Sequence, residues 1–169
     1  MENKLWRLTL DTNPEDCNLN CIMCEEHSKY SNFKKLLFEQ TGKKRRVMPE
    51  GWLYEIFKQA SELGIREIIP STMGEPLFYK HIDVFFELAS RFNIKINLTT
   101  NGTFPKKTVD EWAKIIVPCT SDTKFSVNEA SPLVVESIMQ GLQFKKQIEN
   151  INKFIEYRND YYRSNGIYS

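Results

Sequence analysis

The 169-residue sequence lacks the features that mark several specialised classes of protein. It has no apolar run near the roughly 18 residues of a membrane span, and its first residues do not resemble a signal peptide. Glycine and proline number only seven each, which excludes collagen-like and low-complexity chains. The 23 Lys and Arg residues barely outnumber the 22 Asp and Glu residues, so no basic excess indicates a nucleic-acid partner. We therefore expect a cytoplasmic protein that contacts neither membrane nor nucleic acid.

The composition is sufficient for one folded domain. Hydrophobic residues make up 41% of the chain, enough to form a core, and the length lies within the range of about 100–200 residues that is usual for one domain. We find no linker and no internal repeat, and we expect a single domain over residues 1–169.

Strand-like and helix-like segments alternate along the sequence. Apolar patterns predict strands at residues 6–10, 66–70, 94–98 and 124–127. Apolar residues at helical spacing predict helices at 53–63, 82–92 and 109–116, and again from about 132, with a long last helix over 144–155. This order predicts an α/β fold of about four parallel β/α units joined by right-handed crossovers, with an exposed parallel edge at its last strand.

Cysteine or small polar residues follow each predicted strand. The first strand is followed by Cys17, Cys21 and Cys24 in a C-x3-C-x2-C spacing. The later strand ends carry, in chain order, Gly74, Glu75 and Pro76, then Asn101 and Gly102, then Ser126 and Asn128. Because the carboxyl ends of parallel strands meet at one edge of a sheet, we expect these residues to form one site.

The cysteine spacing by itself allows two kinds of metal centre. Three thiolates on a short loop can bind three irons of a 4Fe–4S cluster and leave the fourth iron open. Alternatively, Cys17, Cys21, Cys24 and His27 could form a structural Cys3His zinc site. Otherwise His27 is expected to be a surface or loop histidine, the basic run at residues 43–46 a solvated charge run, and Cys119 an ordinary thiol.

Together, these motifs resemble those of the radical S-adenosylmethionine (radical SAM) enzymes. The cysteine spacing, Gly-Glu-Pro, Thr-Asn-Gly and Ser-x-Asn occur in the family's order over nearly the whole chain. Residues 124–131 look most like the branch that carries C-terminal SPASM domains, many members of which modify peptides or proteins. The resemblance implies a partial (β/α)6 barrel, and the expected domain is a radical SAM core over residues 1–169.

The resemblance also implies roles for individual residues. The three cysteines would bind a 4Fe–4S cluster whose open iron takes the amino and carboxylate groups of S-adenosylmethionine. The residues expected to contact or shape the site of S-adenosylmethionine are Met23, Gly74, Glu75, Pro76, Asn101, Ser126 and Asn128. A low-potential donor of the flavodoxin or ferredoxin type would supply the electron that generates a 5′-deoxyadenosyl radical, which would abstract hydrogen from a peptide or protein substrate. No residue is assigned a catalytic role of its own.

The sequence departs from the family pattern at several positions. Met73 stands where the first glycine of Gly-Gly-Glu-Pro is usual, and Met23 stands where an aromatic residue near the adenine is usual. Only four strand–helix units can be assigned, so we interpret the chain as a core truncated after the fourth unit, without later barrel strands or a SPASM domain. Two alternatives stay open: a catalytically inactive remnant that binds the cluster, and a small zinc-binding α/β protein.

Overall fold

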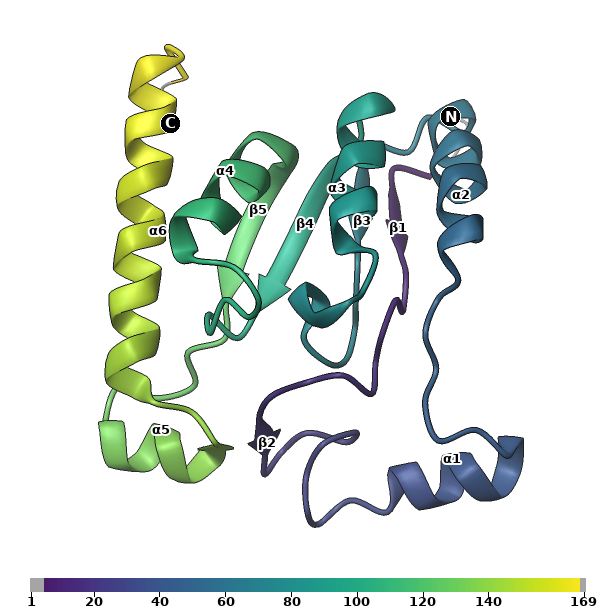
Figure 1. Cartoon of the computed structure of the whole chain (residues 1–169), viewed down its shortest axis with the longest axis vertical. Coiled ribbons are helices and arrows are strands. Elements are labelled where there is room, and N and C mark those ends of the chain that lie inside the picture. Colours follow the sequence, from purple (N-terminus) through teal and green to yellow (C-terminus); the bar gives the residue numbers. More distant parts are fainter. Residues whose placement is uncertain (1–4, 168–169) are drawn as a thin grey trace.

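A parallel four-stranded sheet forms the centre of the protein (Figure 1). The computed structural model describes residues 5–167. The sheet has the order β1-β3-β4-β5, and all three neighbouring pairs are parallel. The bounds of its strands are β1 (Arg7–Thr9), β3 (Glu67–Ile69), β4 (Lys95–Thr100) and β5 (Thr120–Phe125). The predicted α/β fold with four parallel strands is confirmed.

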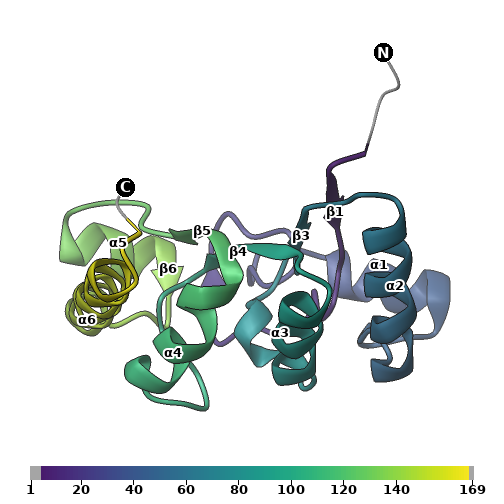
Figure 2. The same cartoon turned by 90° about the horizontal axis from the view of Figure 1, so that it is seen from above.

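Three helices cover one face of this sheet (Figure 2). They are α2 (Glu50–Glu62), α3 (Ile82–Arg91) and α4 (Val109–Cys119). Every second residue of a strand points to the same face, and on this face Ile68, Ile96 and Leu98 are fully buried. They belong to the main core together with the large helix side chains Phe57, Phe85 and Trp112.

The opposite face of the sheet carries a row of polar contacts. The Glu67 carboxylate on β3 accepts hydrogen bonds from Arg7 Nε on β1 at 2.5 Å and from Asn97 Nδ2 on β4 at 3.3 Å. Asn97 Oδ1 in turn accepts one from Lys124 Nζ on β5 at 2.9 Å. Adjacent strands are therefore linked across this face by side-chain hydrogen bonds rather than by apolar packing.

The long last helix, α6 (Phe144–Ser164), packs beside α4 at the β5 end of the sheet. Its Phe154 is buried between two other rings, with ring centroids 5.7 Å from Phe104 and 5.4 Å from Phe125. These aromatic contacts fix the helix against the edge strand.

Several smaller elements were not predicted. The polar stretch after the cysteines contains α1 (Phe33–Thr41), which buries only Leu37. The two-residue strand β2 (Asn20–Cys21) pairs antiparallel with β6 (Met139–Gln140). Strand β6 follows α5 (Pro132–Ile138), which lies where the sequence predicts a helix from about residue 132. A 3-10 helix, η1 (Pro76–Phe78), follows β3. These elements surround the end of the sheet at which β4 terminates (Figure 1).

The fourth strand also differs in its bounds. Residues 124–127 were predicted, whereas β5 runs from Thr120 to Phe125. Its first residues are polar and partly exposed because β5 lies at the edge of the sheet, so they give no apolar signal.

Within residues 5–167, none of the helices combines the length and the apolar character that crossing a bilayer would require.

We predict that Phe154→Ala detaches α6 from the edge of the sheet. Loss of a fully packed ring should lower the free energy of unfolding by about 3–5 kcal/mol. Urea denaturation followed by circular dichroism measures this change. The exposed Asn152 on the same helix provides the control, and Asn152→Ala should stay within about 0.5 kcal/mol of the wild type.

Candidate functional site

A pocket of about 280 Å³ lies at the carboxyl ends of the strands. Its lining brings together residues from all four strand ends, namely Cys17, Met23, Cys21, Cys24, His27, Gly74, Glu75, Thr100, Asn101, Ser126 and Asn128, among others. All the sequence-predicted site residues except Pro76 and Gly102 line it. Pro76 is buried just beside it as the first residue of η1.

The cysteine loop, defined here as residues 12–28, is held by the rest of the fold. Its β2 segment pairs Cys21 with Met139 of β6, and Leu19 is buried in a small second core with Val135, Met139 and Leu142. The backbone N–H of Leu19 lies 3.4 Å from Cys17 Sγ, and Asn101 Nδ2 lies 3.8 Å from it. Two donors are therefore directed at this sulfur, an arrangement that suits a thiolate ligand.

The thiols of Cys17 and Cys21 are protonated at neutral pH in the metal-free protein. Burial raises the pKa of Cys17 to about 11, with a smaller contribution from the nearby Glu75 carboxylate. The pKa of Cys21 is also raised, first by burial and then by the charge of Cys24. A metal must therefore displace protons from these thiols when it binds.

The described residues show no preformed site for a single zinc ion. In the part of the chain that the structure describes, no three His, Cys, Asp or Glu side chains surround a point where one metal ion would fit. His27 Nε2 instead lies 3.0 Å from the carbonyl oxygen of Pro14. The thiolates of a 4Fe–4S cluster each bind a different iron, so their sulfurs need not converge on one point. Three thiols around one pocket are compatible with such a cluster.

The expectation that His27 is a surface or loop histidine is correct for its place in the cysteine loop but wrong for its exposure. Its side chain is buried, and this burial lowers its pKa. The Lys43–Arg46 run also differs from the expected solvated charge run, because Arg45 and Arg46 pair with carboxylates of the cysteine loop.

Glu75 is a buried carboxylate on the wall of the pocket. Only 1% of its surface is exposed, and its oxygens accept hydrogen bonds from Asn101 N at 2.7 Å, Thr100 Oγ1 at 2.8 Å and Leu77 N at 3.3 Å. Burial nevertheless raises the pKa of Glu75 to about 7. Among residues 5–167 no cationic side chain pairs with it. The pocket thus holds an anionic group that would be stabilised by a bound cation.

Gly74 allows the cysteine loop to approach Glu75 closely. Its φ is +73°, and a Cβ atom at this position would lie 2.7–2.8 Å from the carbonyl oxygens of Asn13, Pro14 and Asp16. The two segments are joined by a hydrogen bond from Glu75 N to the Asp16 carbonyl at 2.7 Å. A side chain in place of Gly74 would separate the buried carboxylate from the thiols.

Gln147 is a site-supporting residue that the sequence reasoning missed. Its Nε2 donates to the backbone carbonyls of Asn101 at 2.7 Å and Ser126 at 3.0 Å, which connects α6 to the ends of β4 and β5. Gln147 is 1% exposed and lies four and seven residues before the buried Ile151 and Phe154. A polar residue at that position of an apolar stripe is the signal that could have identified it.

Comparison with known proteins identifies the family. The sequence model described as the Radical SAM superfamily matches residues 14–168. The chain belongs to the radical SAM superfamily. Comparison with curated proteins gives no significant match.

Solved structures share the fold of this radical SAM chain. SuiB from Streptococcus suis bound to S-adenosylmethionine superposes with a TM-score of 0.67 and 21% identity, over 90% of this chain and 32% of SuiB. SuiB bound to its precursor peptide SuiA superposes with a TM-score of 0.64 and 22% identity, over 90% of this chain and 31% of SuiB. BtrN in complex with AdoMet and 2-DOIA superposes with a TM-score of 0.55 and 17% identity, over 87% of this chain and 55% of BtrN. The chain thus spans about a third of the length of SuiB.

We predict that Glu75 destabilises the metal-free protein as pH rises. The carboxyl has a higher pKa in the folded chain, about 7, than in the unfolded chain, so its ionisation costs stability between about pH 4.5 and 7. Glu75→Gln removes this cost, so the variant should gain about 2–3 kcal/mol relative to wild type between pH 5 and pH 8. Urea titrations at both pH values measure the change. An equal difference at both pH values would show that the Glu75 pKa is not raised.

Proposed function

We propose that this chain is a radical SAM core domain that binds a 4Fe–4S cluster and S-adenosylmethionine and cleaves the latter reductively. The proposal rests on one observation, the buried Glu75 carboxylate facing the same pocket as Cys17, Cys21 and Cys24. When bound, the reduced cluster supplies the electron that breaks a sulfonium C–S bond, giving methionine and a 5′-deoxyadenosyl radical that abstracts hydrogen from substrate.

The charge of the pocket supports this ligand pair. Once its thiols are deprotonated, the pocket carries three thiolates and one carboxylate, and neither desolvation nor mutual repulsion favours that state without cations. The positive charge of the irons would compensate the negative charge of the thiolates. The ammonium and sulfonium groups of S-adenosylmethionine are the further positive charges that suit Glu75.

The number of thiols supports an open iron. The fourth cysteine, Cys119, ends α4 and lines a different pocket with Ser90 and Pro118. It lies at the amino end of β5, away from the cysteine loop. Three cysteine ligands leave one iron of a 4Fe–4S cluster for an amino acid group of S-adenosylmethionine.

The remaining site residues have roles in binding S-adenosylmethionine. Glu75 accepts the methionyl ammonium, with Gly74 and Pro76 setting its position. Ser126 and Asn128 contact the methionyl carboxylate or the ribose hydroxyls, and Asn101 shapes the turn between them. The exposed Met23 in the lining of the pocket would lie against the adenine.

The substrate we propose is a peptide or protein. The sequence of residues 124–131 resembles the SPASM-associated branch, and the fold is shared with SuiB, which has been crystallised with a precursor peptide. The electron donor is of the flavodoxin or ferredoxin type, and the protein acts in the cytoplasm.

We predict that the three loop cysteines, and not Cys119, hold the cluster. After anaerobic reconstitution the wild type should contain about four irons and four acid-labile sulfides per chain. Replacing Cys17, Cys21 or Cys24 with Ala should remove most of both, whereas Cys119→Ala should retain them. One tightly bound zinc in place of iron and sulfide would contradict the proposal.

We predict that Glu75 strengthens binding of S-adenosylmethionine to the reduced cluster. Titration with S-adenosylmethionine should change the electron paramagnetic resonance spectrum of the wild type. Glu75→Gln removes a buried charged hydrogen-bond partner, worth roughly 1.5–3 kcal/mol, and should raise the Kd by about 10- to 150-fold. The exposed Glu25 on the cysteine loop is the matched control, and Glu25→Gln should leave the titration unchanged. Equal Kd values for both variants would exclude the role given to Glu75.

A further inference from the structure

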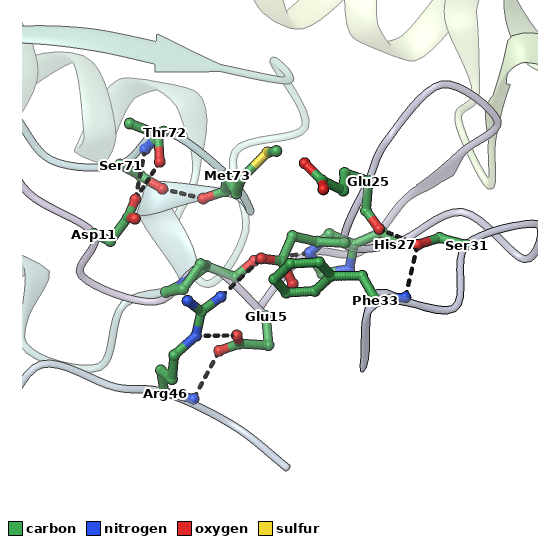
Figure 3. A network of polar contacts seen from close by, with 12 residues as sticks. Asp11, Glu15, Glu25, His27, Ser31, Phe33, Arg46, Ser71, Thr72 and Met73 are labelled. Carbon is green, nitrogen blue, oxygen red and sulfur yellow. Dashed lines mark hydrogen bonds and ion pairs between the residues drawn. The ribbon is translucent and has the colours of Figure 1, made fainter. Parts of the chain in front are cut away.

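The basic run before α2 contacts acidic residues of the cysteine loop. These residues lie on either side of the three cysteines, in the parts of the loop called its flanks below. Arg45 pairs with Asp16, and Arg46 pairs with Glu15 and Glu26. Figure 3 shows the Arg46 guanidinium directed at the Glu15 carboxylate. This contact joins two segments about 30 residues apart, and no feature of the local sequence required it.

Arg46 holds both ends of the cysteine segment at once. Its Nε donates to Glu15 Oε1 at 2.5 Å and its backbone N–H donates to Glu15 Oε2 at 2.7 Å. Its Nη2 donates to Glu26 Oε1 at 2.8 Å. Glu15 lies two residues before Cys17 and Glu26 lies two residues after Cys24. One guanidinium therefore fixes the distance between the two flanks of the three thiols.

The two carboxylates depend on this arginine. Each has only 3% of its side-chain surface exposed, and Glu26 Oε2 has no hydrogen-bond partner among the described residues, so Arg46 supplies the charged contact of this carboxylate through Oε1. The planar guanidinium also lies over the Phe33 ring, with Cζ 5.6 Å from the ring centroid. Two buried carboxylates at one place repel each other unless a cation lies between them. A guanidinium can contact both with separate N–H groups, which the single ammonium of lysine cannot do equally well.

The rest of the loop has anchors that do not involve Arg46. Leu19 is packed in the second core, Cys21 pairs with Met139, and Glu75 N bonds to the Asp16 carbonyl. The main core under the sheet contains neither Arg46 nor its partners. Loss of Arg46 should therefore loosen the cysteine loop without unfolding the domain.

We propose that Arg46 is a positioning residue that keeps the flanks of the cysteine loop together and so sets the spacing of the thiols for the cluster. The relevance to the cluster rests on the proposed function. The positioning itself is a property of the metal-free chain and can be tested without any cofactor.

The first experiment compares thiol reactivity in the metal-free protein. Mass spectrometry after timed alkylation gives a rate for each cysteine, with Cys119 as an internal reference far from the loop. In Arg46→Ala the rates at Cys17 and Cys24, relative to Cys119, should rise about 10-fold or more as the loop opens. Arg45→Ala, which removes a more exposed pair, should change them less than 2-fold, and Arg46→Lys should give an intermediate rate.

Two outcomes would overturn the proposal. Unchanged relative rates in Arg46→Ala would show that the loop stays closed without the arginine. A rise at all four cysteines, Cys119 included, would show that Arg46 acts on global stability instead. If Arg46→Ala does not fold, Glu26→Ala releases only one flank and should accelerate Cys24 more than Cys17. An equal acceleration at these two cysteines, relative to the wild type, would then overturn the proposal.

The second experiment tests the link to the cluster. After reconstitution, release of iron to a chelator should be about 10-fold faster in Arg46→Ala than in wild type or Arg45→Ala. If the wild type takes up no cluster, the proposed function fails while the alkylation result still decides the role of Arg46. If the wild type is loaded and Arg46→Ala loses iron at the wild-type rate, the positioning of the thiols for the cluster is refuted.

Discussion

The close contact between the Gly-Glu-Pro loop and the cysteine loop is the constraint on which the site depends. Gly74 leaves room for three backbone carbonyls of the cysteine loop, and Glu75 N bonds to one of them. This contact places a buried carboxylate and three thiols around one pocket. The parallel sheet makes the contact possible because β1 and β3 are neighbours whose carboxyl ends emerge side by side.

The site contains buried ionisable groups whose charged forms are unfavourable in the metal-free protein. Glu75 is buried without a cationic partner among residues 5–167, and burial also raises the pKa of Cys17. Natural proteins accept such costs at binding sites and offset them in the core. Here the offset comes from the aromatic and aliphatic packing of α2, α3 and α4 against one face of the sheet. A positively charged ligand therefore finds a pocket that already favours it.

The sequence predicted the parts of the fold that follow from local patterns. Ile96 and Leu98 alternate with polar residues, and the helix stripes around Phe57, Phe85 and Trp112 have helical spacing, so the central strands and their helices could be assigned. Motifs at strand ends were expected to converge because parallel strands share one edge. The β2–β6 pair, the burial of His27 and the partners of Arg46 could not be predicted. Each arises from a contact between segments distant in the chain, with no periodic signal in either one.

The pairing of β2 with β6 has a consequence for the order of events during synthesis. Cys21 sits opposite Met139, so the loop near the amino terminus gains this partner only when a segment more than a hundred residues later has emerged from the ribosome. Until then the nascent chain presents three thiols on an incomplete scaffold. The cysteine loop therefore completes its backbone pairing only after most of the domain has been synthesised.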